Sequence, residues 1–505
     1  MDRRRFLKHA GAAAVVVGAS ALALDLLTRP SNPPQTTTST PTATTTSSAT
    51  ITRPTIENLT WTPTRIVNGK VYSGSVTFDA QSANSLVVEA QLEFDPVYAQ
   101  GIPMRAFTPE SRRLYRLSSN SSKVHFSQEI QSLIGGKQYR VQVDVKDQHG
   151  RESQGSLDIP YVREFENIAG SDDTTVVADY YTWYAKPPDA WVNDDLTSHF
   201  YTPILGEYDS ADPTVISKHI DWATGRGIDT FSVSWWGDVN VSAENLTNAF
   251  LKHPMADQMM FFILYENNGR LRISNPNEPS SKWIEDLDDS FNRSRLISDF
   301  ELLAENYFAH PNYLRINGKP VVRFDYTTCF RGDVAGAFAE LREALKQKGL
   351  DIYLINDLMG RGASPYTDTD EPGINETHFR EITQAFDAIG ASGFSDQYDD
   401  IAKDAQFVES IYHAWRDYAK KYGKDFIPGV CPGHHGSLPW YVPPSYVPWK
   451  RSPERLAHQI RLAAHYSTIE TFSIISFNEW YLGHQIEPSE EEGFVYLDSV
   501  KGSIS

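Results

Sequence analysis

The sequence predicts an α/β protein in which an all-β sandwich precedes a (β/α)8 TIM barrel. Two observations carry this prediction. Residues 56–167 contain short runs with period-two alternation, whereas residues 173–505 alternate about eight apolar, strand-like runs with helical patterns. The first 55 residues differ from both parts, because their composition cannot supply a core.

Residues 1–27 have the pattern of an export signal. Arg3, Arg4 and Arg5 precede an apolar run that is too short to favour a stable membrane span. The segment resembles a twin-arginine signal, and the alternative is an anchor that stays uncleaved. We expect an extracytoplasmic protein of a prokaryote, secreted or tethered to the cell surface through its N-terminus. Residues 28–55 are mostly Thr, Ser, Pro and Ala, which predicts a linker.

Residues 56–167 predict the β-sandwich. The alternating runs are "GKVYSGSVTFDA", "SLVVEAQLEFD" and "KQYRVQVDVKD", and "QHGRESQG" has the composition of a turn. This spacing, without a strong helical stretch, is typical of an immunoglobulin or fibronectin-like sandwich. Such a domain is either a spacer or a carbohydrate-binding module, and the sequence leaves both interpretations open.

Residues 173–505 predict the barrel. The expected strands are 176–183, 230–236, 260–266, 320–326, 352–358, 385–392, 426–431 and 471–479. The segment "DPTVISKHIDWATGRG" is a clear helix, with Asp212 as N-cap, Pro213 at the first position and Gly225 and Gly227 as stop signals. A doubly wound sheet is the alternative, but no glycine-rich phosphate loop follows any strand, so we favour the barrel.

Composition excludes several functions. The 505 residues carry a formal net charge of -19, which argues against nucleic acid as a partner, because phosphate binding needs clustered Lys and Arg. Two cysteines, Cys329 and Cys431, give no CxxC site, although one disulfide between them remains open. We expect no cofactor, and the sequence does not predict an oligomeric state.

Residues at the carboxyl ends of barrel strands converge on one face, where they form the expected site. They are Trp183 and Tyr184, Trp235 and Trp236, Glu266, Asp325, Asp357, His434, and Asn478, Glu479 and Trp480. Aromatic rings stack on the C–H faces of sugars, and amides, acids and imidazoles bond to hydroxyls. The mixture therefore predicts a glycan or polysaccharide ligand.

Several of these residues have a structural alternative. Trp235 and Trp236 point to opposite faces of one strand, so only one of them can line the site. Glu266 can pair with a nearby arginine, Arg270 or Arg272, and Asp325 and Asp357 can cap loops. His434 and His435 are adjacent, but no second histidine or carboxylate pair stands at the spacing of metal ligands, so we predict no metal.

Four segments together resemble glycoside hydrolase family 99. They are "DYYTWYAKP", "LGEYDSADPTVISKHIDWATGRGIDTFSVSWWG", "HPNYLRINGKPVVRFDY" and "SFNEWYLGHQIEPS", and the resemblance covers about residues 176–497. It implies an endo-acting α-mannosidase on a (β/α)8 barrel that works without metal. It also implies that Glu479 takes the proton of the sugar's 2-hydroxyl, so that this oxygen attacks the anomeric carbon. The family's second glutamate, which protonates the leaving oxygen, corresponds to Leu482.

Leucine cannot donate a proton, so the resemblance leaves the acid unassigned. We expect Glu266 to replace it, with Glu487, Asp325 and Asp357 as other acids near the site. The substrate platforms expected are Trp183, Tyr184, Trp235, Trp236 and Trp480, and the hydroxyl partners are Asn478, Glu487, Asp325, Asp357 and His434. A substrate with a better leaving group, or a lectin-like surface protein that binds glycan without cleaving it, is the alternative.

Overall fold

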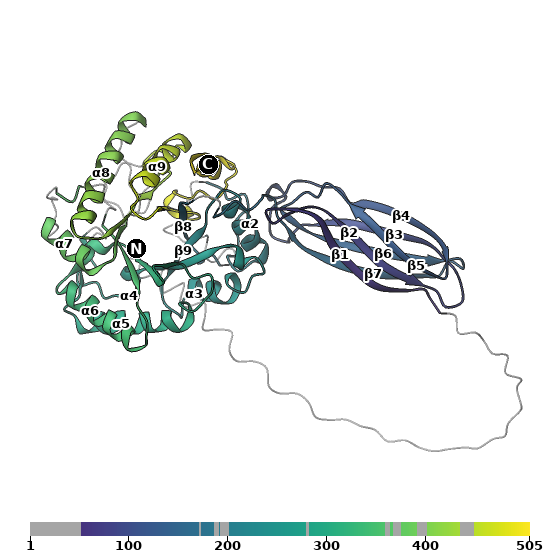
Figure 1. Ribbon diagram of the computed structural model, residues 1–505, viewed down its shortest axis with the longest axis horizontal. Coiled ribbons are helices and arrows are strands. Elements are labelled where there is room, and N and C mark those ends of the chain that lie inside the picture. Colours follow the sequence, from purple (N-terminus) through teal and green to yellow (C-terminus); the bar gives the residue numbers. More distant parts are fainter. Residues whose placement is uncertain are drawn as a thin grey trace, which may run out of the picture.

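The computed structural model describes residues 52–170, 173–185, 191, 201–278, 282–358, 364–366, 375–390, 401–434 and 449–504. The predicted export signal and nearly all of the predicted linker lie outside these residues. Within the described part of the chain, no helix is long and apolar enough to cross a membrane. The described residues form a sandwich and a barrel that are consecutive in sequence (Figure 1).

The N-terminal unit is a sandwich of two antiparallel sheets, in the orders β1-β2-β5 and β4-β3-β6-β7. Its strands are β1 (Thr55–Val67), β2 (Lys70–Gln81), β3 (Val87–Val97), β4 (Arg113–Ser121), β5 (Lys123–Ile130), β6 (Lys137–Asp147) and β7 (Glu152–Val162). Alternate residues such as Phe78, Leu92 and Val143 are 0% exposed and form one core between the sheets. The predicted alternation is thus confirmed as a two-sheet unit.

The second unit is a nearly closed barrel of parallel strands, consistent with a (β/α)8 barrel. The strands are β8 (Thr175–Tyr180), β9 (Thr230–Trp235), β10 (Met260–Tyr265), β13 (Lys319–Phe324), β15 (Tyr353–Asp357), β16 (Ala388–Gly390), β17 (Asp425–Ile427), β18 (Gly429–Val430) and β19 (Thr471–Ile474). Pro428 separates β17, which pairs with β16, from β18, which pairs with β19. These two strands therefore occupy one position, and every predicted strand is observed within a few residues of its expected place.

Helices surround the barrel (Figure 1). They are α2 (Pro213–Thr224), α3 (Val241–Asn245), α4 (Asn267–Arg270), α5 (Ser290–Asn306), α6 (Val334–Gln347), α7 (Glu376–Ala385), α8 (Ile401–Lys421), α9 (Pro453–Tyr466) and α10 (Val495–Ile504). Short elements are η2 (Met104–Ala106), η3 (Leu246–Phe250), η4 (Ala256–Gln258), η6 (Thr327–Cys329), η7 (Trp480–Leu482), β11 (Glu285–Asp286), β12 (Arg315–Ile316) and β14 (Phe330–Arg331). Helix α2 begins as predicted, because Asp212 accepts hydrogen bonds from two N–H groups of the first turn.

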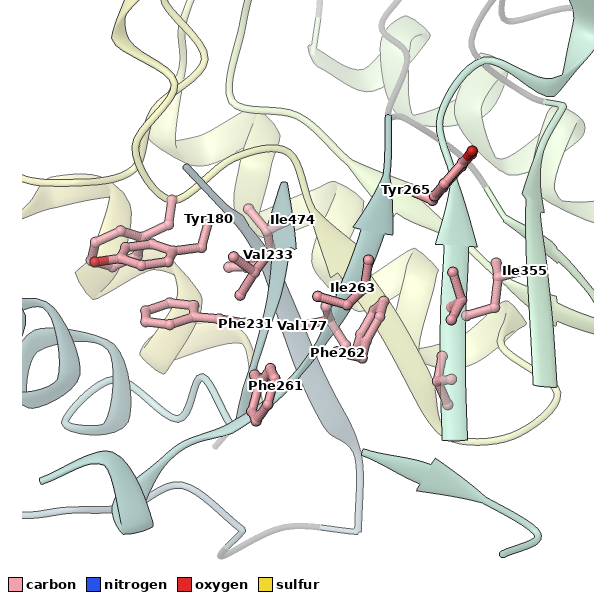
Figure 2. Close-up of a cluster of buried hydrophobic side chains, with 14 of the residues drawn as sticks. Val177, Tyr180, Phe231, Val233, Phe261, Phe262, Ile263, Tyr265, Ile355 and Ile474 are labelled. Atoms are coloured by element: carbon pink, nitrogen blue, oxygen red, sulfur yellow. The ribbon is translucent and has the colours of Figure 1, made fainter. Parts of the chain in front are cut away.

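The strands of the barrel divide their residues between two faces. Tyr180 stacks on Phe231 with ring centroids 4.2 Å apart, and both side chains lie in the apolar cluster of Figure 2. Successive side chains of a strand point to opposite faces, so Ser232 and Ser234 lie on the face of β9 opposite to Phe231. This alternation leaves small polar side chains on the inner face, where Ser234 reaches a carboxylate at the end of β10.

Helix α2 forms part of the contact between the two units. The carboxylate of Asp221 accepts hydrogen bonds from Tyr161 Oη (2.9 Å) and from the N–H of Phe165 (3.1 Å), and it lies 3.4 Å from Arg163. Burial raises the pKa of Asp221. Lys218 is also 0% exposed, with Nζ 4.6 Å from the ring centroid of Phe107 in the sandwich. Two opposite charges are thus buried where the units meet.

We expect Lys218→Met to stabilise the protein near neutral pH. Burial lowers the pKa of Lys218 to about 8, against an ordinary value of 10.5. Between these values the unfolded chain binds more protons than the folded chain, so the free energy of unfolding rises with pH across that window. Below pH 8 the native lysine therefore carries its full penalty, and the substitution should add about 1–3 kcal/mol.

Urea unfolding at pH 7 and near pH 10 measures this effect. The gain from Lys218→Met should be large at pH 7 and shrink toward pH 10. Lys346→Met, on the exposed side of α6, is the matched control and should change little. A loss of stability at pH 7 would contradict the interpretation.

Candidate active site

Glu479 lies in the loop that follows β19, and its side chain is 13% exposed. His484 Nε2 lies 3.0 Å from Glu479 Oε2, and the backbone N–H of Glu479 donates to Ser476 Oγ at 2.8 Å. A histidine, rather than an arginine, is therefore the side-chain partner of this carboxylate. The carboxylate is fixed on one side and keeps access to solvent.

Asn478 fixes the neighbouring strand end. Its Oδ1 accepts the N–H of Tyr181 at 2.8 Å, and its Nδ2 donates to the carbonyl oxygen of Tyr181 at 2.9 Å. The amide is 0% exposed. The prediction of Asn478 as a partner of sugar hydroxyls is therefore wrong, because its hydrogen-bonding groups are used to join the loop after β19 to the end of β8.

The charges of several carboxylates act on the Tyr181 side chain. Burial is the largest cause that raises the pKa of Tyr181, and it is followed by the negative charges of Glu479, Asp179, Glu266 and Asp325. These acids come from the ends of β8, β10 and β13 and from the loop after β19. The predicted acids Glu479, Glu266 and Asp325 are thus brought together at the carboxyl face of the barrel.

Glu266 is held by the inner face of β9. Ser234 Oγ donates to Glu266 Oε1 at 2.6 Å, and Trp236 Nε1 donates to Ser234 Oγ at 2.9 Å. The alternative partners are engaged elsewhere, since Arg270 pairs with Asp299 and Arg272 pairs with Asp289. Glu266 therefore belongs to the carboxyl-face cluster and is only 3% exposed.

The tryptophans at the ends of β8 and β9 separate as the pleat predicts. Trp235 is 1% exposed and stacks on Tyr265 with centroids 5.9 Å apart, on the helix side of the sheet. Trp236 lies on the other side, 6.2 Å from the partly exposed ring of Trp183. Trp183 in turn packs on Tyr181 at 4.5 Å. Trp183 and Trp236 thus lie beside the acids, whereas the prediction of Trp235 as a platform is wrong.

Two further predicted platforms are buried. Tyr184 and Trp480 are both 0% exposed, so neither ring can stack on a sugar. The hydroxyl of Tyr184 donates to the carbonyl oxygen of Asn478 at 2.8 Å and accepts the N–H of Trp480 at 3.1 Å. These two predictions are wrong, because Tyr184 holds the backbone of the loop that carries Glu479 and the Trp480 indole donates to the buried carboxylate of Glu487.

Glu487 was predicted to contact substrate, but it forms a buried polar network. Its Oε2 accepts hydrogen bonds from Tyr208 Oη (2.8 Å) and Trp480 Nε1 (2.9 Å), and its Oε1 lies 3.1 Å from His219 Nε2. The side chain is 0% exposed. Its oxygens are committed to the protein, and its role is structural.

The remaining predicted residues lie at or near the carboxyl face. Asp325 is partly exposed, whereas Asp357 is buried and accepts the N–H of Tyr326 at 3.4 Å. His434 is partly exposed, and its ring stacks on that of His484 with centroids 5.6 Å apart. Asp357 therefore favours the loop-capping interpretation, while Asp325 and His434 stay candidates for substrate contact.

Leu482 lies on the short helix η7 and is 8% exposed. The chain therefore places an apolar, buried side chain three residues after Glu479. Both cysteines are buried free thiols, so the disulfide left open by the sequence is not formed. In the described part of the chain, no three His, Cys, Asp or Glu side chains group in a way that could hold a metal ion.

Sequence reasoning missed the residues that organise the cluster. Tyr181 was overlooked, although it stands one residue after β8 and two residues after Asp179, so that both point to the same face. Asp179 pairs with Arg323 at 2.9 Å across the barrel interior. His484 and Ser476 were also missed, because Ser476 lies inside the strand expected at 471–479 and His484 lies beyond its end. The alternation of β8 could have indicated Asp179, whereas His484 gave no signal before the loop was folded.

Comparisons with known proteins agree with this architecture. The profile of glycosyl hydrolase family 99 matches residues 184–329. The glycoprotein endo-alpha-1,2-mannosidase of Rattus norvegicus is 24% identical over 338 residues, which cover 65% of this chain and 64% of that protein. The Xenopus laevis enzyme of the same name is 24% identical over 351 residues, which cover 61% and 68%. The chain thus spans just under two thirds of the length of the rat relative.

A solved structure described as a glycoside hydrolase-like protein is similar in fold. It gives a TM-score of 0.51 at 18% identity and covers 66% of this chain and 94% of that chain. At this identity the likeness concerns the fold alone. The family profile ends before the loop that carries Glu479, so the roles of the site residues rest on the geometry above. The barrel, the profile match and the two relatives together identify a protein similar to glycoside hydrolase family 99.

Proposed function

We propose that the chain is a glycosidase that cleaves glycans containing α-linked mannose. The carrying observation is that Glu479 and Glu266 are joined to the same group of rings. Glu479 follows Asn478, which bonds to the backbone of Tyr181, and Tyr181 packs on Trp183. Trp183 lies beside Trp236, which donates to the Ser234 hydroxyl that holds Glu266. Acids beside aromatic rings suit a polyol substrate. The rat and frog relatives are named as endo-alpha-1,2-mannosidases, which supports mannose as the sugar.

In this proposal Glu479 is the base. It takes the proton of the sugar's 2-hydroxyl, whose oxygen forms a bond to the anomeric carbon while the glycosidic C–O bond breaks. Water then attacks the anomeric carbon, the new C–O bond opens, and the 2-oxygen regains its proton from Glu479. The accessible carboxylate in the loop after β19 supports this role.

Glu266 is the proposed proton donor. A departing glycosidic oxygen needs a proton, and Leu482 has none to give. Glu266 lies near the same phenol as Glu479, and Ser234 fixes one of its oxygens at 2.6 Å. It gives its proton to the leaving oxygen and recovers one from the attacking water, so the cycle closes without a further reactant.

An assay of reducing ends tests the function. The purified full chain is incubated with α-mannan and with high-mannose oligosaccharides, and the released ends are followed over time. Release of defined mannose-containing fragments supports the proposal. Binding without release would refute hydrolysis and favour a glycan-binding protein, and neither binding nor release would refute the glycan assignment.

We expect Trp183→Ala to weaken substrate binding. The indole is partly exposed and packs on Tyr181 at 4.5 Å, beside the acids. Loss of one stacking partner costs about 1 kcal/mol, so KM should rise roughly five- to tenfold while kcat changes less. Trp61→Ala, which removes a partly exposed indole from the sandwich, is the control and should leave KM unchanged. An unchanged KM in Trp183→Ala would contradict the platform role.

We also propose that the N-terminal segment exports the chain and that the sandwich is of fibronectin type. The strand orders β1-β2-β5 and β4-β3-β6-β7 support the second part. N-terminal sequencing of the protein from cells and medium tests the first part. Recovery of an intact chain only from the cytoplasm would refute export.

A further inference from the structure

We propose that His484 is a positioning residue for Glu479, and that the N–H of its ring holds this carboxylate in place to act as a base. This inference rests on the proposed function, because it concerns the same carboxylate. The imidazole is 3% exposed, so it reaches solvent much less than Glu479 does. Its role is therefore to hold and tune a group that meets substrate.

A chain of hydrogen bonds fixes the ring. His484 Nδ1 lies 3.0 Å from Ser476 Oγ, and Nε2 lies 3.0 Å from Glu479 Oε2. Ser476 Oγ already accepts the N–H of Glu479 at 2.8 Å, so its own O–H can donate to Nδ1. The ring proton is then on Nε2 and points to the carboxylate. One oxygen of Glu479 is thereby held while the other stays available.

The backbone on both sides of His484 is also fixed. Arg451 donates to the carbonyl oxygens of Gly483 at 2.8 Å and Gln485 at 2.9 Å. The N–H of Ser476 donates to the carbonyl oxygen of His484 at 2.9 Å. Gly483 has φ of 68°, which lets the chain leave η7 in a left-handed turn. The ring is thus presented to Glu479 by a preformed loop.

The same geometry excludes a nucleophilic serine. Ser476, His484 and Glu479 resemble a hydroxyl–imidazole–carboxylate triad, but Ser476 is 0% exposed and its Oγ accepts the N–H of Glu479. No substrate atom can approach it. The serine therefore selects the tautomer of the histidine, and the reactive end of the chain is the carboxylate.

Two substitutions separate positioning from structure. His484→Gln keeps an N–H donor at this position, so kcat should stay within about fivefold of the wild-type value. His484→Leu removes the donor, and kcat should fall about ten- to a hundredfold with KM changed less than threefold. His465→Gln, on the exposed side of α9, should alter nothing.

Equal losses in both variants would overturn the proposal, as would full kcat in His484→Leu. Nitrogen-15 NMR of histidine-labelled full-length chain, without substrate, is the second readout. We expect a ring signal protonated on Nε2 at neutral pH that is absent from His484→Gln and shifted in Glu479→Ala. A ring protonated on Nδ1 would overturn the proposal. If no variant or wild type cleaves glycan, the proposed function fails, and the NMR separately reports whether the histidine–carboxylate pair exists.

Discussion

Glu479→Gln should lower kcat for release of reducing ends by about 10²–10⁴-fold. The amide has the shape of the carboxylate and can still accept the hydrogen bond from His484 Nε2, so the loop should keep its conformation. It cannot accept the proton of a sugar hydroxyl. We therefore expect kcat to fall while the circular dichroism spectrum and the unfolding midpoint stay unchanged, which would show that the fold is intact.

The matched control is Glu343→Gln, an exposed glutamate on α6 that lies away from the carboxyl face. It should retain full activity. Binding of the glycan to the Glu479→Gln protein should persist, because the rings of Trp183 and Trp236 are untouched. A Glu479→Gln protein that hydrolyses at the wild-type rate would remove this residue from the mechanism.

Glu487→Leu should produce the largest loss of stability, about 3–5 kcal/mol in the free energy of unfolding of the barrel. The substitution keeps the volume but leaves Tyr208, Trp480 and His219 without their buried acceptor. The polar groups of these three side chains are then buried without this hydrogen-bond partner, which destabilises the folded state. Urea unfolding followed by tryptophan fluorescence measures the loss.

Glu487→Gln is the graded control for this site. Its amide oxygen can still accept from one or two of the donors, so the loss should be roughly half as large. Activity should fall in proportion to the folded fraction in both variants, because the carboxylate touches no substrate in the proposed mechanism. A Glu487→Leu protein as stable as wild type would show that the network contributes little.

The arrangement of strands could be predicted because it depends on local signals. Apolar runs and turn residues indicated where the strands lie, the cap at Asp212 indicated where α2 begins, and the pleat separated Trp235 from Trp236. The position of Glu479 and Glu266 at the carboxyl face could be predicted for the same reason, since each follows an apolar strand, whereas their catalytic roles stay predictions. These inferences need only the sequence next to the residue concerned.

The direction of the other polar side chains could not be predicted, because it depends on distant partners. Glu487 is held by His219 on α2 and by Tyr208, both more than 250 positions away in sequence. Asn478 bonds to Tyr181 across the junction of the last and first barrel strands. A polar residue next to an aromatic residue looks the same in the sequence whether it contacts substrate or, like Asn478, bonds to a neighbouring strand end.

The charges of Asp221 and Lys218 tie the evolutionary fate of the two units together. Exchange of the sandwich for an unrelated module would expose one face of α2 and remove the backbone donor that Phe165 supplies. A replacement domain would have to supply its own N–H groups as hydrogen-bond donors to the Asp221 carboxylate. It would also need an aromatic ring to cover the Lys218 ammonium. Shuffling of modules at this boundary is therefore costly, and we expect the pair to be inherited as a single block.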